Sequence, residues 1–172
     1  MDDLTLSRIP AQVRDIERET KELGFTMASD TRTGALLRTL AATKPGGAFL
    51  ELGTGTGLGT AWILAGMDQS SHLLTVDNDE QVVSIARKYL GSDSRAVFNI
   101  ADGAQFLESI SDRRFDFIFA DTWAGKYDHL ESALRLLSPG AFYIIDDMSP
   151  VDSWPEGHAR KVDALDSVLE SR

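Results

Sequence analysis

Acidic side chains recur at the ends of the apolar runs in this 172-residue chain, and acids in such positions can do chemistry. Each strand-like run finishes on or beside a carboxylate, and these acids are Glu51, Asp77, Asp102, Asp121 and Asp146. Carboxylates can accept hydrogen bonds from hydroxyl groups, bind organic cations or hold a hard metal ion such as Mg²⁺. Packing alone hardly explains acids at every strand end, so we predict that they surround one ligand site.

Glycines follow the first of these acids in the segment Gly53-Thr-Gly55-Thr-Gly57-Leu-Gly59. Alternating glycines leave the backbone uncovered, so a ligand can contact main-chain N–H groups, and a helix start beyond them favours polar or negative ligand groups. The dinucleotide fingerprint GxGxxG fails in every register, because Leu58, Thr60 or Trp62 takes the place of its third glycine. An ordinary strand-to-helix turn seldom needs so many glycines, so we predict a nucleotide-type site.

Alternating strand-like and helix-like segments must position these residues. The pattern predicts strands over 48–52, 72–77, 96–100, 115–121 and 141–146, with helices over 60–67, 79–90, 103–110 and 126–137 between them. Two accessory helices precede the strands, one over 10–23 and one that begins at the cap Ser29-Asp30-Thr31 and ends before Pro45. This alternation predicts an α/β, Rossmann-like, doubly wound and mostly parallel sheet covered on both faces. We expect one domain, with N-terminal helices in 1–46, a core in 47–150 and a C-terminal helix in 151–172.

The formal net charge of -10 and the absence of cysteine narrow the classes of partner and compartment. Nucleic acids and anionic membranes require a basic surface, so we expect neither and favour a small neutral or cationic molecule. A chain without cysteine has no disulfides and suits a reducing compartment. The first residues lack the basic and apolar regions of a signal peptide, and no run approaches a membrane span, so we expect a cytoplasmic protein.

Glu51 followed by GxGxG resembles the first motif of the class I S-adenosylmethionine-dependent methyltransferases. In that family the loop holds the methionine part of the cofactor. The resemblance therefore implies S-adenosylmethionine as cofactor, with contacts from the acid and the loop, namely Glu51, Gly53, Thr54, Gly55 and Gly57.

The acids after the second and third strands have two interpretations each. Asp77 lies roughly 20 residues beyond the glycine loop, where such folds place an acid on the ribose hydroxyls, and Asn78 stands beside it. Capping of the next helix by Asp77, or by the better placed Asp79, is the alternative. Asp102, Gly103 and Ala104 stand where the resemblance implies contacts to adenine, although Asp102 could equally be a cap.

The segments Asp116–Tyr127 and Leu137–Met148, together with Glu51-Leu-Gly, resemble the catechol O-methyltransferase family, over roughly residues 29–150. In that family an acid after the fourth strand and an Asp-Asn pair after the fifth hold Mg²⁺, which implies Asp121, Asp146 and Asp147 here.

Two positions depart from that pattern, because Asp147 replaces the amide and Ala124 replaces the catalytic lysine. Lys126, two residues further on, is the candidate base. In a metal-free alternative, Asp121 contacts only the cofactor and Asp146 caps a turn.

Trp123 follows the fourth strand and is expected beside the cofactor as a wall of the methyl-acceptor pocket, or else as packing. The three histidines, His72, His129 and His158, show no clustering and are expected to be structural or solvated. The family ends with an antiparallel strand pair, whereas here Val151–Pro155 leads to one helix over about 158–169. We therefore expect either a truncated chain or a five-stranded sheet with an exposed fifth strand, which favours a homodimer.

These features predict a methyltransferase that acts on an oxygen of a small molecule, with Asp121 and Lys126 as catalytic candidates and Mg²⁺ as an optional second cofactor. Nucleic-acid base methyltransferases usually carry a polar residue and Pro-Pro-aromatic after the fourth strand, and Asp121-Thr-Trp-Ala does not match. A nucleotide-dependent oxidoreductase and a non-catalytic cofactor-binding protein are the alternatives.

Overall fold

A five-stranded sheet lies at the centre of the computed structural model, which describes residues 9–150 and 157–171. The strands are β1 (Ala48–Leu52), β2 (His72–Asp77), β3 (Ala96–Ile100), β4 (Phe115–Ala120) and β5 (Leu137–Ile145). Their order is β3-β2-β1-β4-β5, and every pairing is parallel. This arrangement confirms the predicted Rossmann-like sheet.

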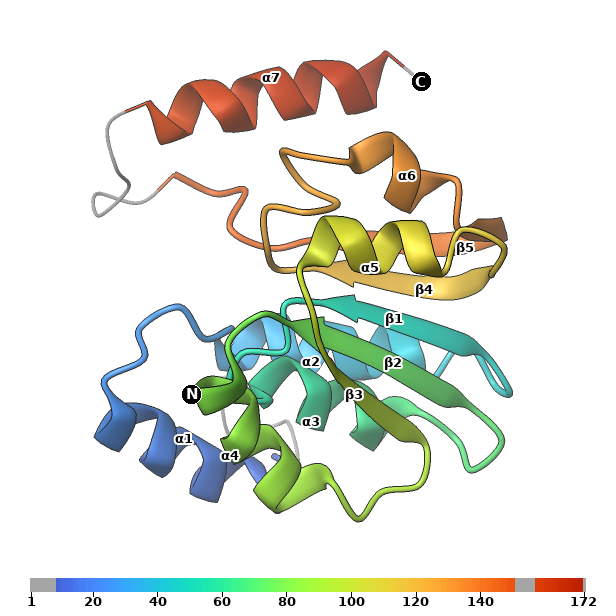
Figure 1. Cartoon of the computed structure of the whole chain (residues 1–172). Coiled ribbons are helices and arrows are strands. Elements are labelled where there is room, and N and C mark those ends of the chain that lie inside the picture. The colour runs from blue at the N-terminus through green and yellow to red at the C-terminus, as the bar shows by residue number, and fades with distance from the viewer. Residues whose placement is uncertain (1–8, 151–156, 172) are drawn as a thin grey trace, which may run out of the picture.

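Helices cover both faces of the sheet (Figure 1). One face carries α1 (Val13–Leu23), α2 (Thr31–Ala41), α3 (Leu58–Gly66) and α4 (Glu80–Leu90). The other face carries α5 (Gly103–Ser109) and α6 (Leu130–Leu134), with α7 (His158–Glu170) on the same side (Figure 1). Among the described residues, no helix is long and apolar enough to cross a membrane.

The alternation of side chains along β1 explains both halves of the core. Phe49 packs into the cluster beneath α1 to α4, whereas Leu50 and Leu52 pack into the cluster beneath α5 and α6. All three are fully buried, as expected for the central strand of a parallel sheet. Glu51 falls on the α3 face in this alternation, so its carboxylate points into the interior between β1 and α3.

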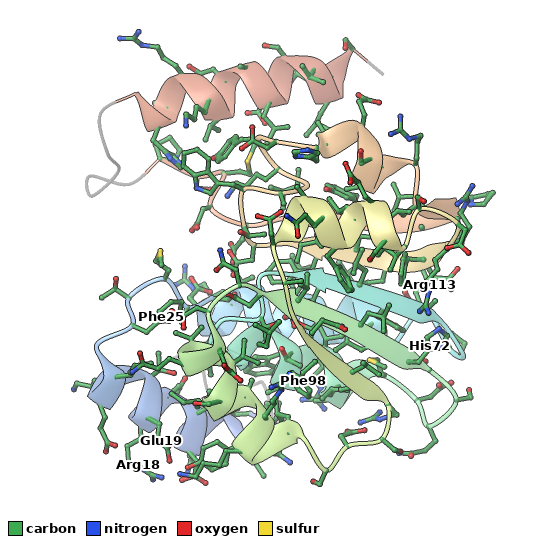
Figure 2. The ribbon with its side chains drawn as sticks, viewed as in Figure 1. Arg18, Glu19, Phe25, His72, Phe98 and Arg113 are labelled. Atoms are coloured by element: carbon green, nitrogen blue, oxygen red, sulfur yellow. The ribbon has the colours of Figure 1, made fainter. Side chains whose placement is uncertain are left out.

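The N-terminal helix α1 is fastened to the rest of the α3 face by polar contacts. Thr20 Oγ1 lies 2.7 Å from Thr56 Oγ1 in the glycine loop. Glu19, labelled in Figure 2, accepts hydrogen bonds from Lys88 Nζ at 2.6 Å and from the Tyr89 hydroxyl of α4. The accessory helix therefore packs against the loop and α4 rather than standing apart from them.

The prediction of a long helix over 126–137 is wrong, because α6 spans only Leu130–Leu134. The N–H groups of Lys126, Tyr127 and Asp128 all donate to the carbonyl oxygen of Trp123, at 3.1, 3.0 and 3.0 Å. This shared acceptor closes residues 123–128 into a compact loop that cannot continue as a helix.

The fifth strand is longer than predicted and begins at Leu137. Pro139-Gly140 lies inside β5 as an irregularity, since Phe115 pairs with Leu137 but Phe117 pairs with Phe142. The other elements agree with prediction apart from their ends; for example, the helix expected over 60–67 is Leu58–Gly66. The predicted lead-in Val151–Pro155 lies outside the described residues, and β5 is an edge of the described sheet.

Candidate active site

The glycine loop sits at the carboxyl end of β1 in a backbone conformation that favours glycine. Gly53, Gly55 and Gly57 have φ values of 99°, 50° and 94°. A Cβ atom on Gly53 would lie 2.6 Å from the carbonyl oxygen of Asp121. The loop and the residue after β4 therefore touch through their backbones, which brings the predicted cofactor loop and the predicted catalytic acid together.

Several N–H groups of this loop are used inside the protein. Gly53 N and Thr54 N both donate to Val76 O, at 2.9 and 3.1 Å, and Gly57 N donates to Thr54 O at 2.9 Å. The sequence predicts direct contact of exposed N–H groups with a ligand, and the N–H groups of Gly53, Thr54 and Gly57 are instead bonded within the protein. These internal hydrogen bonds indicate that the glycines serve mainly to bring the backbone close to its surroundings.

Asp77 holds the loop from the neighbouring strand. Its Oδ2 accepts a hydrogen bond from Gly55 N at 2.8 Å, and its Oδ1 accepts one from Asp79 N at 3.0 Å. The side chain is half-buried, and Asn78 beside it is exposed at the same edge of the sheet. Contact of Asp77 and Asn78 with a ribose stays a prediction. The hydrogen bond from Gly55 N shows that Asp77 also holds the glycine loop in place.

The capping interpretations hold for two other acids. Asp79 caps α4 by accepting from Gln81 N at 2.9 Å, and Asp102 caps α5 by accepting from Ala104 N and Gln105 N at 3.0 and 3.1 Å. Gly103 brings the start of α5 against the loop after β4, because a Cβ there would lie 2.7 Å from Ala124 Cβ. The predicted adenine contacts of Asp102, Gly103 and Ala104 remain predictions at this edge.

Phe25 lies at the same end of the sheet, between α1 and α2 (Figure 2). A Cβ on Gly55 would touch its ring at 3.4 Å, so Phe25 lies beside the glycine loop. It lines a hollow of about 270 Å³ together with Glu17 of α1 and Leu58 of α3. Figure 2 shows His72 at the opposite end of the sheet, which agrees with the prediction that it has no part in the site.

Asp121 is the most perturbed acid at this edge. Its pKa is raised to about 8, mainly by burial. The negative charges of Asp146 and Asp147 also raise this pKa, and the charge of Glu51 has a smaller effect. Ser29 Oγ opposes this shift by donating to Asp121 Oδ2 at 2.9 Å. Ionisation of Asp121 is therefore unfavourable in the folded protein, and its carboxyl group has one hydroxyl donor, Ser29, from the segment before α2.

Lys126 lies among these acids despite the altered course of its loop. Its side chain is only 5% exposed, and Nζ donates to the carbonyl oxygen of Asp146 at 2.5 Å. Burial lowers its pKa, while the charges of Asp147, Asp121 and Asp146 oppose that shift. A buried amine with a depressed pKa has the chemistry of a general base.

The predicted Mg²⁺ site stays a prediction, with little support from this arrangement. Within residues 9–150 and 157–171, no three Asp, Glu, His or Cys side chains are grouped so that they could hold a metal ion. Asp146 is half-buried and has a raised pKa through burial, whereas Asp147 is exposed and adopts a positive φ of 55°. Lys126 lies near these carboxylates, and their side chains are not grouped as metal ligands. We therefore assign no step to a metal.

Trp123 stands at the outer rim of the site and is 55% exposed. Its ring meets Tyr127 edge-on with centroids 5.8 Å apart, and Lys161 Nζ of α7 lies 3.7 Å above it. The Tyr127 hydroxyl is 3.1 Å from His158 Nε2, also on α7. These contacts tie α7 to the loop after β4 and give His158 a structural contact, as predicted; the contact of Trp123 with cofactor or acceptor stays a prediction.

Sequence reasoning missed the role of Ser29. We interpreted it as part of a helix cap, but Asp30 alone caps α2 by accepting from Thr33 N at 2.8 Å. Ser29 instead reaches Asp121, which is 92 residues away in the sequence. No local signal could have paired the two residues, since only the folded sheet brings them together.

The raised pKa values at this edge predict a pH dependence of stability. Burial raises the pKa of Asp121 from 3.8 to about 8 and that of Glu51 from 4.5 to about 7. Between pH 5 and pH 8 the folded protein therefore binds more protons than the unfolded chain, and stability falls as pH rises. We expect a loss of about 1 to 3 kcal/mol over this range, measured by urea denaturation with EDTA present. A stability that rises steadily from pH 5 to pH 8 would contradict this assignment.

Comparison with known proteins gives the family. A family model described as a methyltransferase domain matches residues 50–148, and the chain belongs to this family. A Mycobacteroides abscessus protein named for O-methyltransferase activity is 32% identical over 121 residues, which cover 67% of this chain and 56% of that protein. A Mycobacterium avium protein with the same type of name is 28% identical over 117 residues, covering 65% and 53%. The chain thus spans about half the length of these relatives.

Solved structures confirm the fold. A Bacillus cereus O-methyltransferase in complex with S-adenosylhomocysteine has a TM-score of 0.84 at 20% identity and covers 97% of this chain and 82% of its own. The Streptomyces achromogenes O-methyltransferase TomG, described as involved in tomaymycin synthesis and in complex with S-adenosylmethionine, has a TM-score of 0.82 at 20% identity, covering 97% and 81%. The chain therefore has the fold of these methyltransferases.

Proposed function

We propose that this chain binds S-adenosylmethionine and transfers its methyl group to an oxygen of a small molecule. One observation carries the proposal: the left-handed glycine loop after β1 packs against the backbone of Asp121, in a chain of the methyltransferase-domain family. The complexes of the Bacillus and Streptomyces proteins with the demethylated and methylated cofactor support it. S-adenosylmethionine supplies a methyl group on a positively charged sulfur.

The residues at the carboxyl edge would have different roles in the reaction. The glycine loop and Asp77 would hold the cofactor, while Asp121 offers a negative charge to its cationic part. With the cofactor bound, the acceptor oxygen would form a bond to the methyl carbon, and the carbon–sulfur bond would break with its electron pair left on sulfur. Lys126, in its deprotonated form, would take the proton of the acceptor hydroxyl. Alignment of the oxygen with the methyl carbon can supply about 7 to 11 kcal/mol of the barrier reduction.

The acidic balance of the chain and its relatives support a small acceptor rather than a nucleic acid. Cytoplasmic location, a homodimer through the open edge of β5, and Mg²⁺ at Asp121, Asp146 and Asp147 stay predictions. Mg²⁺ is the least supported of them, because the donor residues are not grouped.

Titration calorimetry with S-adenosylhomocysteine tests the cofactor. We expect one-to-one binding and no heat with NADH, since the oxidoreductase alternative requires the reverse. Radiolabelled methyl transfer to a panel of phenols, with EDTA and with Mg²⁺, then separates an enzyme from a non-catalytic binding protein. Absence of binding to both forms of the methyl cofactor would exclude the proposed function.

Replacement of the proposed base gives a sharper test. Lys126→Met should lower kcat by about 100-fold or more while S-adenosylhomocysteine binding changes little. Lys44→Met is the matched control, because Lys44 Nζ also donates to a carbonyl, that of Gly140 at 2.6 Å, and lies 4.5 Å from the centre of the Phe142 ring. It precedes β1 and so lies at the other end of the sheet. Equal losses in the two variants would contradict a role of Lys126 in proton transfer.

A further inference from the structure

A chain of hydroxyl groups runs beneath the glycine loop to one buried carboxylate oxygen. Thr60 Oγ1 and Thr75 Oγ1 donate to Glu51 Oε2, at 2.5 and 2.7 Å. Thr54 Oγ1 of the loop lies 2.6 Å from Thr75 Oγ1. Because Thr75 has a single hydroxyl hydrogen and donates it to Glu51, Thr54 must be the donor in the remaining hydrogen bond.

The parallel register creates this arrangement. Glu51 and Thr75 are direct partners in the β1–β2 pairing and point to the same face of the sheet. Thr60 reaches the same oxygen from the first turn of α3. Gly59 leaves room for the carboxylate, since a Cβ there would lie 2.7 Å from Glu51 Oε1. One carboxylate thus joins two strands, a helix and the glycine loop.

Burial separates this carboxylate from the open side of the loop. Glu51, Thr60 and Thr75 are all 0% exposed, and Thr54 is 3% exposed. Glu51 Oε1 is also buried, and it has no hydrogen-bond partner among the described residues. A direct contact between Glu51 and the cofactor, as the resemblance implied, would require this side chain to leave its buried position.

We propose that Glu51 is a positioning residue rather than a cofactor ligand, and that Thr75 and Thr60 complete a relay that holds Thr54 and the glycine loop in the shape that binds S-adenosylmethionine. The inference rests on the proposed function. Thr54 stands between Gly53 and Gly55, which both adopt left-handed conformations. Its inward hydroxyl bond therefore fixes the peptide units on either side of it.

Thr75→Val tests the relay, because it keeps the shape of the side chain and removes the hydroxyl. We expect the dissociation constant of S-adenosylhomocysteine to rise by about 10-fold, and kcat at saturating cofactor to stay within a few-fold of the parent. Thr75→Ser should restore binding. Glu51→Gln should likewise recover most of the affinity that Glu51→Ala loses, since the amide oxygen can accept from Thr60 and Thr75.

Ser71→Ala is the matched control. Ser71 is 3% exposed, donates to Asp68 Oδ1 at 2.8 Å, and precedes the same strand at its other end. It should lower the melting temperature without changing the dissociation constant. Amide hydrogen exchange of Gly53 and Gly55, measured without ligand, should become faster in Thr75→Val and stay unchanged in Ser71→Ala.

The outcomes distinguish the relay from the proposed function. Failure of the parent protein to bind either form of the methyl cofactor defeats the proposed function, while hydrogen exchange still reports on the relay. Parent-like binding and exchange in Thr75→Val would overturn the relay alone. A Glu51→Gln variant as weak as Glu51→Ala would overturn the positioning role and favour a direct charge contact. If Thr75→Val does not fold, Thr75→Ser and the two Glu51 variants still decide between these outcomes.

Discussion

Gly53→Ala should abolish measurable cofactor binding and destabilise the protein by about 3 kcal/mol. The residue has a φ of 99°, and a left-handed conformation costs an L-residue about 1 to 2 kcal/mol. The added Cβ would also lie 2.6 Å from the Asp121 carbonyl oxygen and 2.9 Å from its carbon. These neighbours are backbone atoms and cannot rotate away, so overpacking adds about 1 to 3 kcal/mol. Because Asp121 N still donates to Leu52 O at 2.8 Å, β4 is held against β1 here, and relief of the clash must displace the loop or the acid.

Gly140→Ala separates the collision from the backbone strain. Gly140 has a φ of 77°, but a Cβ there would have nothing within 4 Å, and it lies away from the loop in β5. We expect it to lose only the conformational part, about 1 to 2 kcal/mol, and to bind S-adenosylhomocysteine like the parent. Urea denaturation and titration calorimetry of both variants provide the measurements. If the two variants lose the same stability and bind S-adenosylhomocysteine equally well, the close approach of the loop to Asp121 is not the reason for glycine at position 53.

The positions of the strands along the chain could be predicted from local patterns, and the same patterns give the edge at which the site is proposed. Nearly continuous apolar runs such as 115–120 are typical of buried parallel strands, and in such sheets ligands bind beyond the strand ends where these acids lie. These patterns depend on residues close in sequence. The same reasoning failed over 126–137, because Lys126, Tyr127 and Asp128 share the Trp123 carbonyl and so interrupt a pattern that suits a helix.

The partners of the acids could not be predicted, because they are set by register and by distant segments. Thr75 resembles any β-branched strand residue until the pairing with β1 places it opposite Glu51. Ser29 resembles a helix cap until the segment before α2 crosses the end of β4. For Asp102, the sequence left an adenine contact and a capping role open, and two backbone donors in α5 show that it caps the helix. Local chemistry therefore predicts where the site lies, whereas tertiary contacts determine which partners each acid has.

Asp121→Asn should change stability and activity in opposite directions. Burial and the charge of Asp146 raise the pKa of this acid from 3.8 to about 8, so near pH 8 the ionised form is disfavoured in the folded protein. An amide has nearly the same shape, can still accept from Ser29, and carries no charge. We expect the unliganded variant to gain about 1 to 3 kcal/mol of stability at pH 8. The gain should shrink toward pH 4, where the carboxyl group of the parent is protonated in the folded protein and, with an ordinary pKa of 3.8, about half protonated in the unfolded chain.

Asp116→Asn is the control for this gain, since Asp116 lies on the same strand and accepts a hydrogen bond from Ala48 N at 2.9 Å. It removes a charge that the fold uses as an acceptor, so stability should fall or stay unchanged. Urea denaturation from pH 4 to pH 8 compares the two variants. A loss of stability in Asp121→Asn at pH 8 would mean that neighbouring groups already stabilise the ionised carboxylate of Asp121 in the unliganded parent.

The same substitution should lower kcat/KM by about 100-fold, because a cation beside Asp121 favours the ionised carboxylate that Asn cannot provide. S-adenosylmethionine carries this positive charge and S-adenosylhomocysteine does not. Asp121→Asn should therefore weaken binding of the methylated cofactor more than binding of the demethylated product, and calorimetry with both compounds measures the ratio. An unchanged ratio would place the sulfonium away from Asp121. A reduced ratio in a more stable protein would indicate that the fold holds an unfavourable charge in place for the cofactor to neutralise.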